Sequence, residues 1–274
     1  MAVVNPASLI RMAFEHHYAI AAYNVDSVDM AMAVVRGGEA AKVPILLQVT
    51  VDTLNAWGWE RITQMVYSLG SSSEIPIGLH LDHCKVIEDI FRAIDLGFTS
   101  VMYDGSTLEM ELNIQNTLKV VDYARLHNVM VEAELGHVGR EGEPPEWQSV
   151  TSVEEASEFY AQTRVDCLAV AIGTQHGKKI GEDNIRFDRI RDIRRDVAVP
   201  LVLHGSSGVS NDILCKLVPF GISKVNIGTE LRTIWWQRLL ENQTRKPREA
   251  LSLMCQAIMD YVNEKSQLLS HPVN

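Results

Sequence analysis

The sequence predicts an α/β protein, a (β/α)8 TIM barrel in which one domain carries extra helices at its C-terminal end. Apolar strand-like runs recur eight times, amphipathic helical patterns separate them, and polar residues gather where the runs end. A single barrel of this kind takes roughly 250 residues. Because no Pro/Ser-rich or low-complexity linker interrupts the 274 residues, we expect residues 1–274 to form one domain.

The predicted strands are short, nearly continuous apolar runs, which is typical of parallel strands buried on both faces. In chain order they cover residues 19–25, 44–50, 76–82, 100–105, 129–135, 167–173, 201–205 and 224–228. Between them, apolar residues at helical spacing predict helices over 28–41, 86–96, 110–127, 153–163, 187–195 and 211–220. This alternation of strand and helix predicts a parallel sheet.

Polar residues at the ends of the apolar runs favour a closed barrel over an open doubly wound sheet, which would have a similar local pattern. They are Asn24, Gln48, Asp82, His83, Asp104, Glu132, Glu134, His176, His204 and Asn226. In a barrel all these strand ends surround one mouth, and the active sites of barrel enzymes lie there.

Two segments are longer than the alternating pattern requires. Residues 139–151 are rich in Gly and Pro, and they predict either a lid or a disordered surface excursion. After the last strand, residues 230–242 and 247–268 predict two more helices. Side chains expected to be buried there are Trp235, Trp236, Met254, Ile258 and Tyr261. Part of this surface is also expected to form a subunit interface.

Composition excludes several classes of partner. The net charge of −10 and pI near 5.4 argue against binding to nucleic acid or an anionic membrane, because no basic stripe exists to neutralise phosphates. The four cysteines lack paired zinc-type spacing, and neither a signal peptide nor a membrane-spanning apolar stretch is evident. We therefore expect a reduced, cytoplasmic protein that holds any anionic substrate locally.

Three histidines at separate strand ends, His83, His176 and His204, predict a metal site. One such histidine would more often be a packing residue, but three neutral imidazoles with an open fourth position describe a catalytic Zn²⁺ site. His80 occupies a different position on its strand, so we expect it to support the ligands rather than bind the metal.

Carboxylates complete the predicted site. Asp82 is the candidate acid/base because a carboxyl beside a dication can exchange a proton with a reacting oxygen; the alternative is that it caps the following helix. Asp104, Glu132 and Glu134 are expected to hold a second cation or orient the histidines, or to form a buried ion-pair network. Other candidates for binding a substrate oxygen, or merely a neighbouring loop, are Gln48 and Thr50.

Glycines and hydroxyls in the loops after the last three strands predict a phosphate site. The candidates are Gly177, Gly205, Ser206, Ser207, Asn226, Ile227, Gly228 and Thr229. Backbone N–H groups approach an anion closely in such loops, and barrel phosphate sites commonly use the last loops and a helix start. The alternative for each cluster is a tight turn.

The chain resembles the class II, metal-dependent ketose-bisphosphate aldolases over almost its whole length. The matching motifs are YNV at 23–25, HLDH at 80–83, YDGS at 103–106, VEAELG at 131–136, AIGTQHG at 171–177, HGSSG at 204–208 and VNIGTEL at 225–231. The resemblance implies reversible aldol cleavage of a ketose phosphate to dihydroxyacetone phosphate and an aldehyde. It also implies a homodimer or homotetramer.

Residue roles follow from this resemblance. His83, His176 and His204 would bind Zn²⁺, which polarises the ketone and stabilises the enediolate, while Asp82 would exchange a proton with the aldehyde oxygen. The glycine-rich segments and Asn24 would hold dihydroxyacetone phosphate, partly around a monovalent cation, Na⁺ or K⁺. Asp104 and Glu134 are carried as further metal-binding candidates.

Two departures from the family pattern bear on the substrate. Fructose-bisphosphate members usually carry an aspartate where Gly228 stands, whereas tagatose-type members have a small residue, so a tagatose-1,6-bisphosphate-like substrate is favoured. The familiar acidic pair of the 139–151 loop is absent, which leaves Glu141 and Glu143 as candidates for the carbon base. Arg232 matches the position for the distal phosphate, and its alternative is a surface salt bridge.

Two other functions stay open, and a third is disfavoured by the sequence. The aldehyde partner could be unphosphorylated, or the chain could be a non-catalytic stabilising subunit of an aldolase complex, although the intact Asp82 and histidine set argue against that. A metal-dependent hydrolase of the barrel type would carry a His-x-His pair at the first strand, and residues 21–24 contain none.

Overall fold

The computed structural model describes residues 3–138, 150–175 and 180–271. Eight parallel strands pair in chain order, and β8 pairs with β1 to close the barrel. They are β1 Ile20–Asn24, β2 Ile45–Thr50, β3 Ile77–Cys84, β4 Ser100–Tyr103, β5 Met130–Leu135, β6 Cys167–Val170, β7 Leu201–Leu203 and β8 Ile222–Ile227. The predicted barrel is therefore confirmed. The largest difference is at β6, which ends at Val170 instead of residue 173.

The helices surround this barrel as the sequence pattern predicts. They are α2 Val28–Ala41, α5 Ile87–Asp95, α6 Met110–Leu126, α7 Val153–Thr163, α8 Phe187–Val197 and α9 Asn211–Leu217, with short 3-10 turns η2 Glu182–Asn184, η3 Ser206–Gly208 and η4 Val218–Phe220. Side-chain caps explain several starts: Ser27 accepts from the amide of Met30, and Ser152 forms a capping box with Glu155.

Three helices were not predicted: α1 Ala7–His16, α3 Val51–Trp57 and α4 Trp59–Ser72. The start of α3 was hard to see because no loop separates it from β2. Thr50, the last residue of β2, is its N-cap and accepts from the amide of Thr53. Because no run of turn residues marks the boundary, the spacing of apolar residues changes from strand to helix without a visible break.

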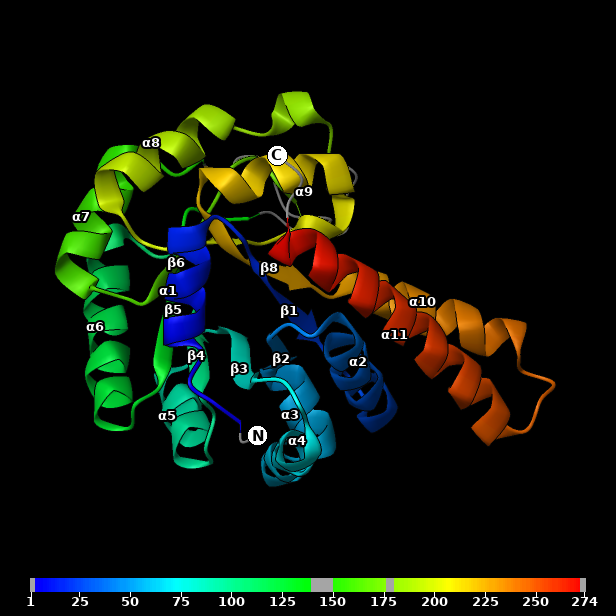
Figure 1. Cartoon of the computed structure of the whole chain (residues 1–274). Coiled ribbons are helices and arrows are strands. Elements are labelled where there is room, and N and C mark those ends of the chain that lie inside the picture. Colours follow the sequence, from blue (N-terminus) through cyan, green and yellow to red (C-terminus); the bar gives the residue numbers. More distant parts are fainter. Residues whose placement is uncertain (1–2, 139–149, 176–179, 272–274) are drawn as a thin grey trace.

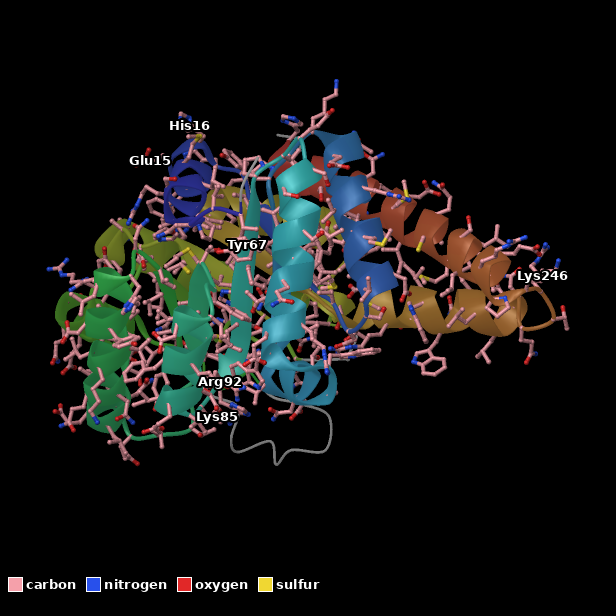
Figure 2. All side chains as sticks on the ribbon, turned by 90° about the horizontal axis from the view of Figure 1, so that it is seen from below. Glu15, His16, Tyr67, Lys85, Arg92 and Lys246 are labelled. Carbon is pink, nitrogen blue, oxygen red and sulfur yellow. The ribbon has the colours of Figure 1, made fainter. Side chains whose placement is uncertain are left out.

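Helix α1 closes the N-terminal end of the barrel (Figure 1). Its buried side chains Ile10 and Ala13 join an apolar cluster inside the ring of strands. The strand residues of that cluster are Ile20, Ala22, Leu46, Met130, Cys167, Ala169 and Val202. Figure 2 shows Glu15 and His16, at the end of α1, and Lys85, after β3, at opposite ends of the barrel. The C-terminal strand ends therefore lie at the other end of the barrel from α1.

The two predicted C-terminal helices are α10 Thr229–Glu241 and α11 Pro247–Ser270. They form a hairpin that projects from the barrel, with Lys246 at its outer tip (Figures 1 and 2). Met254 and Ile258 are buried as expected, but Trp236 is 59% exposed, so the prediction for that residue is wrong. Consecutive helix residues point about 100° apart, and Trp235 takes the inner position, where its indole donates to Asp29.

No helix among the described residues has the length and apolar character that crossing a bilayer requires.

Candidate active site at the C-terminal ends of the strands

A backbone irregularity at the end of β3 brings two consecutive residues to the barrel mouth. Between the pairs Leu81–Val101 and Cys84–Tyr103, β3 has Asp82 and His83 where β4 has only Met102. His83 has a left-handed backbone, φ 49°, which is rare for a residue with a side chain. In a regular strand, neighbours point to opposite faces, so this bulge is what lets both side chains reach the same site.

Donor atoms of His83, Glu134 and His204 all lie within 4.8 Å of one another. Oε2 of Glu134 is 3.5 Å from Nδ1 of His83 and 3.3 Å from Nδ1 of His204. Among the described residues, this buried oxygen has no hydrogen-bond donor. A buried, unsatisfied carboxylate oxygen facing two imidazoles fits a zinc ion, which takes N and O ligands. The third predicted ligand, His176, lies outside the described residues, as does Gly177.

The carboxylates around the two histidines govern their protonation. Burial lowers the pKa of His204, but the hydrogen bond to Glu132 and the neighbouring carboxylate of Glu134 outweigh burial and raise the pKa to about 10. Burial also lowers the pKa of His83. The charge of Asp82 and the hydrogen bond to Asp104 outweigh burial, so the pKa of His83 is raised. The carboxylates around both rings therefore favour positive charge at the same place where a dication would bind.

Asp104 contacts His83 without belonging to the three-residue donor cluster. Its Oδ2 lies 3.2 Å from Nδ1 of His83, and its Oδ1 accepts from the hydroxyl of Ser106 at 2.7 Å. Burial raises the pKa of Asp104, but the His83 hydrogen bond prevails and the pKa is lowered. This geometry favours the predicted role in which Asp104 orients a histidine ligand.

Asp82 is a buried carboxylate held by amides from three other strands. It accepts from Asn24 at 2.8 Å, from Asn226 at 3.3 Å and, at 3.5 Å, from Gln48. Burial raises the pKa of Asp82, yet the nearby charges, His83 first, lower it overall. The helix-capping alternative is excluded because Asp82 lies within β3, and Val86 is the N-cap of α5.

A fully buried lysine, Lys224, was missed by sequence reasoning. Its Nζ lies 2.8 Å from Oε2 of Glu132 and 2.6 Å from Oδ1 of Asn226. Glu132 in turn contacts Nε2 of His204 at 2.9 Å. A signal was present: Lys224 stands two residues before Asn226 in an apolar strand, and that spacing places both on the inner face.

The loops after β7 and β8 contact each other. Gly205 has φ 64°, and a Cβ there would lie 2.9 Å from the backbone carbon of Gln175, so only glycine fits. The hydroxyl of Ser206 donates to the carbonyl of Asn226, which ties the two loops together. Ile227 is buried, and α10 begins directly afterwards at Thr229. A helix N-terminus thus stands beside a close-packed loop, where anions are commonly bound.

Gly228 is small for a reason that the structure makes visible. A Cβ at this position would lie 2.8 Å from Oδ1 of Asn24, the side chain that donates to Asp82. The same Asn24 oxygen accepts from Gln48 at 2.8 Å. Any side chain at Gly228 therefore displaces a residue that orients the acid/base candidate.

Two other predicted substrate contacts have protein partners in the structure. The Nε of Arg232 lies 2.6 Å from Oδ2 of Asp26, and both side chains are partly exposed. Thr50 caps α3 through its side chain. The two candidates for the carbon base, Glu141 and Glu143, lie outside the described residues.

Comparison with known proteins identifies a family. The model of the class II fructose-bisphosphate aldolases matches residues 4–272. The 6-phospho-5-dehydro-2-deoxy-D-gluconate aldolase of Bacillus licheniformis is 37% identical over 244 residues, which is 87% of this chain and 83% of that protein. The sulfofructosephosphate aldolase of Alkalicoccus urumqiensis is 32% identical over 274 residues, 97% and 96% of the two chains. The crystal structure of the YdjI aldolase from Escherichia coli K12 superposes with a TM-score of 0.89 at 31% identity and covers 98% of both chains.

Proposed function

Since the chain belongs to the class II fructose-bisphosphate aldolase family, we propose that it cleaves a ketose phosphate reversibly into dihydroxyacetone phosphate and an aldehyde. The observation that carries this proposal is the position of Asp82, a buried carboxylate of lowered pKa beside the His83, Glu134 and His204 cluster. A carbon–carbon lyase of this kind needs a proton acceptor beside a metal.

Each residue has a definite task in this proposal. His83, His176 and His204 would hold zinc, with Glu134 and Asp104 beside them, and the metal would supply Lewis-acid polarisation of the substrate carbonyl. In cleavage, Asp82 removes the proton from the hydroxyl that becomes the aldehyde oxygen, and in condensation it returns that proton. Asn24 and Asn226 hold its carboxylate in place. Glu141 or Glu143 serves as the carbon base.

The phosphate of dihydroxyacetone phosphate binds at the loops after β6, β7 and β8, around Gly177, Gly205–Ser207 and Asn226–Thr229. The close packing at Gly205 and the start of α10 support this placement. A monovalent cation, Na⁺ or K⁺, shares the site in this proposal, as the family resemblance implies.

A tagatose-1,6-bisphosphate-like ketose is our first candidate substrate, because Gly228 is small and Asn24 fills the space beside it. A second candidate is a ketose phosphate whose far end carries another acidic group. Two relatives are named for such compounds, a phosphorylated gluconate derivative and sulfofructosephosphate. Arg232, held by Asp26 in the structure, is the residue that would meet the far group.

We further propose a homodimer or homotetramer in the cytoplasm. The projecting α10–α11 hairpin exposes Trp236 at 59% and Leu240 at 61%, one helical turn apart on α10. Large apolar side chains gathered on one helix face are typical of subunit interfaces.

Zinc-dependent condensation of dihydroxyacetone phosphate with three-carbon aldehydes tests the proposal. The aldehydes of the panel carry a phosphate, a carboxylate, a sulfonate or no charged group. The stereochemistry of each product is determined. Reaction with the phosphorylated aldehyde alone, to tagatose bisphosphate, supports the first candidate, and Arg232→Gln should then raise KM for that aldehyde. Preference for the aldehyde with a carboxylate or a sulfonate supports the second candidate substrate. Preference for the uncharged aldehyde removes the role proposed for Arg232. No product with any aldehyde would leave the non-catalytic subunit as the better explanation.

A further inference from the structure

We propose that Lys224 is a positioning residue that orients both a metal ligand, His204, and the proton acceptor, Asp82. This inference rests on the proposed function for the roles of those two residues. Lys224 touches neither the donor cluster nor Asp82 directly, but it acts through Glu132 on one side and Asn226 on the other.

The position of Lys224 is costly and therefore calls for an explanation. Its side chain is 0% exposed, as is that of Glu132. A buried ion pair is weak evidence for stability, because removing both charges from water costs about as much as their attraction returns. Apolar side chains fill the barrel at its other end, so the chain has a cheaper way to pack its interior.

Through Glu132, Lys224 determines which nitrogen of His204 faces the donor cluster. Glu132 Oε2 contacts the lysine, which leaves Oε1 at 2.9 Å from Nε2 of His204. With its Nε2 proton directed to Glu132, the ring presents Nδ1 to Glu134, 3.3 Å away. Among the described residues, the other neighbours of Glu132 Oε2 are Nε2 of His80 and Sγ of Cys167, both at 3.7 Å. The Cys167 thiol is only a weak, uncharged donor to this oxygen, and His80 lies beyond hydrogen-bond distance, so neither replaces the ammonium of Lys224.

Through Asn226, Lys224 determines which end of an amide faces Asp82. A lysine ammonium has only donors, so the side-chain oxygen of Asn226 must turn toward it, and this bond is 2.6 Å. The amide nitrogen of Asn226 then points away from the lysine, 3.3 Å from Oδ1 of Asp82 and 3.2 Å from Nε2 of His204. If the amide turned round, its oxygen would face the Asp82 carboxylate, and the two acceptors would repel each other.

The same contacts distinguish this role from covalent catalysis. A lysine that forms a Schiff base attacks with a free amine. The Nζ of Lys224 is instead held between a carboxylate and an amide oxygen as a donor to both. Lys224 is thus a fixed charge beneath the site and not a nucleophile.

Two variants test the inference. Lys224→Met removes the ammonium with little change in side-chain length, and Lys224→Met with Glu132→Gln removes both charges so that no lone buried carboxylate remains. Ser223→Ala is the matched control, since Ser223 is a fully buried neighbour on the same strand whose hydroxyl bonds only the Gly221 carbonyl among the described contacts. Zinc affinity is measured on metal-free protein by competition with a chromophoric chelator, and kcat and KM are measured in excess zinc.

We expect the zinc dissociation constant of the variants to rise by about 10- to 100-fold, as for loss of other groups that orient metal ligands. At saturating zinc, kcat should fall at least about tenfold while KM for dihydroxyacetone phosphate stays within about threefold, because Asp82 and not the phosphate site is disturbed. A folded double variant with the zinc affinity and kcat of Ser223→Ala would overturn the inference. Borohydride trapping of dihydroxyacetone phosphate on Lys224 would overturn it as well.

Zinc affinity keeps this test separate from that of the proposed function. A wild-type protein that binds zinc but condenses no aldehyde refutes the aldolase reaction. Weaker zinc binding by the variants would still support the link from Lys224 to His204.

Discussion

At its N-terminal end the barrel is filled by Leu46 and Met130 against Ile10 of α1, whereas at its C-terminal end the same strands carry Gln48, Glu132 and Glu134. The change takes place within two residues along one inward face. The apolar end lowers the free energy of the folded state by burial, and the polar end holds charges that must be matched to be buried at all. Stability and chemistry are thus separated along the barrel axis, and mutations at the two ends should have different effects.

Removal of the metal should have the largest effect on activity. It should act only through the polar, C-terminal end of the barrel. Because His83, Glu134 and His204 form a donor cluster, we expect chelator-treated protein to lose activity and to recover it with added Zn²⁺ but not Mg²⁺, which prefers oxygen ligands. Zinc should also raise Tm, since a ligand bound only by the folded state stabilises it. Full activity in protein shown by elemental analysis to be metal-free would contradict the proposed site.

Asp82→Asn should come next. The amide retains the size of the carboxylate among Asn24, Asn226 and Gln48, but it cannot accept the proton. We expect kcat to fall about 10²- to 10⁴-fold, the range for loss of a general acid/base, with zinc affinity and Tm close to wild type. A variant with more than about a tenth of wild-type kcat would show that another group moves this proton.

Leu46→Ala tests the apolar end. The side chain is 0% exposed inside the apolar cluster at the N-terminal end of the barrel. We therefore expect a loss of about 2–5 kcal/mol in the free energy of unfolding without a matching fall in kcat. Leu126→Ala is the control, because that side chain is 83% exposed and should change little. If the folded Leu46→Ala variant lost kcat as well as stability, the apolar and polar ends of the barrel would not have separate effects.

Gly228→Ala should give an intermediate effect by disturbing Asn24. The added Cβ meets the Asn24 oxygen at 2.8 Å, so Asn24 must shift away from Asp82. We expect kcat/KM to fall roughly 10- to 100-fold, as a displacement of about 1 Å near the chemistry does. Gly181→Ala is the control, since among the described residues its Cβ would meet nothing closer than an Asn184 side chain at 3.6 Å. Equal kinetics for the two variants would remove Asn24 from the positioning of Asp82.

Thr50→Ala should have the smallest effect and should decide between two roles. As the N-cap of α3, Thr50 should contribute about 1 kcal/mol to stability, and Thr50→Ser should restore it. KM for dihydroxyacetone phosphate should stay unchanged. A KM raised about tenfold, equivalent to 1.4 kcal/mol of binding, would instead confirm the sequence prediction that Thr50 contacts substrate.

The sequence predicted the polar end of the barrel better than the apolar end. Polar residues such as Asp82 and His204 interrupt apolar runs, so they are visible in a linear pattern, and the family motifs contain them. Helix α1 was not predicted, because its apolar residues Ile10 and Ala13 show their role only against the strands that they cover. Trp236 was placed inside because apolar character alone does not say which side of a helix meets the core.

Sequence alone determined the eight strands and most of the helices between them, the residues at the strand ends, and the family, since these depend on periodicity and local motifs. Tertiary structure alone decided the bulge that turns His83 toward Glu134, the capping role of Thr50, and the contacts of Lys224 with Glu132 and Asn226. The physical reason is that local hydrophobic patterns act between near neighbours. Partners in a charge network are chosen by distance, and closure of the barrel brings together residues as far apart in the chain as Glu132 and Lys224.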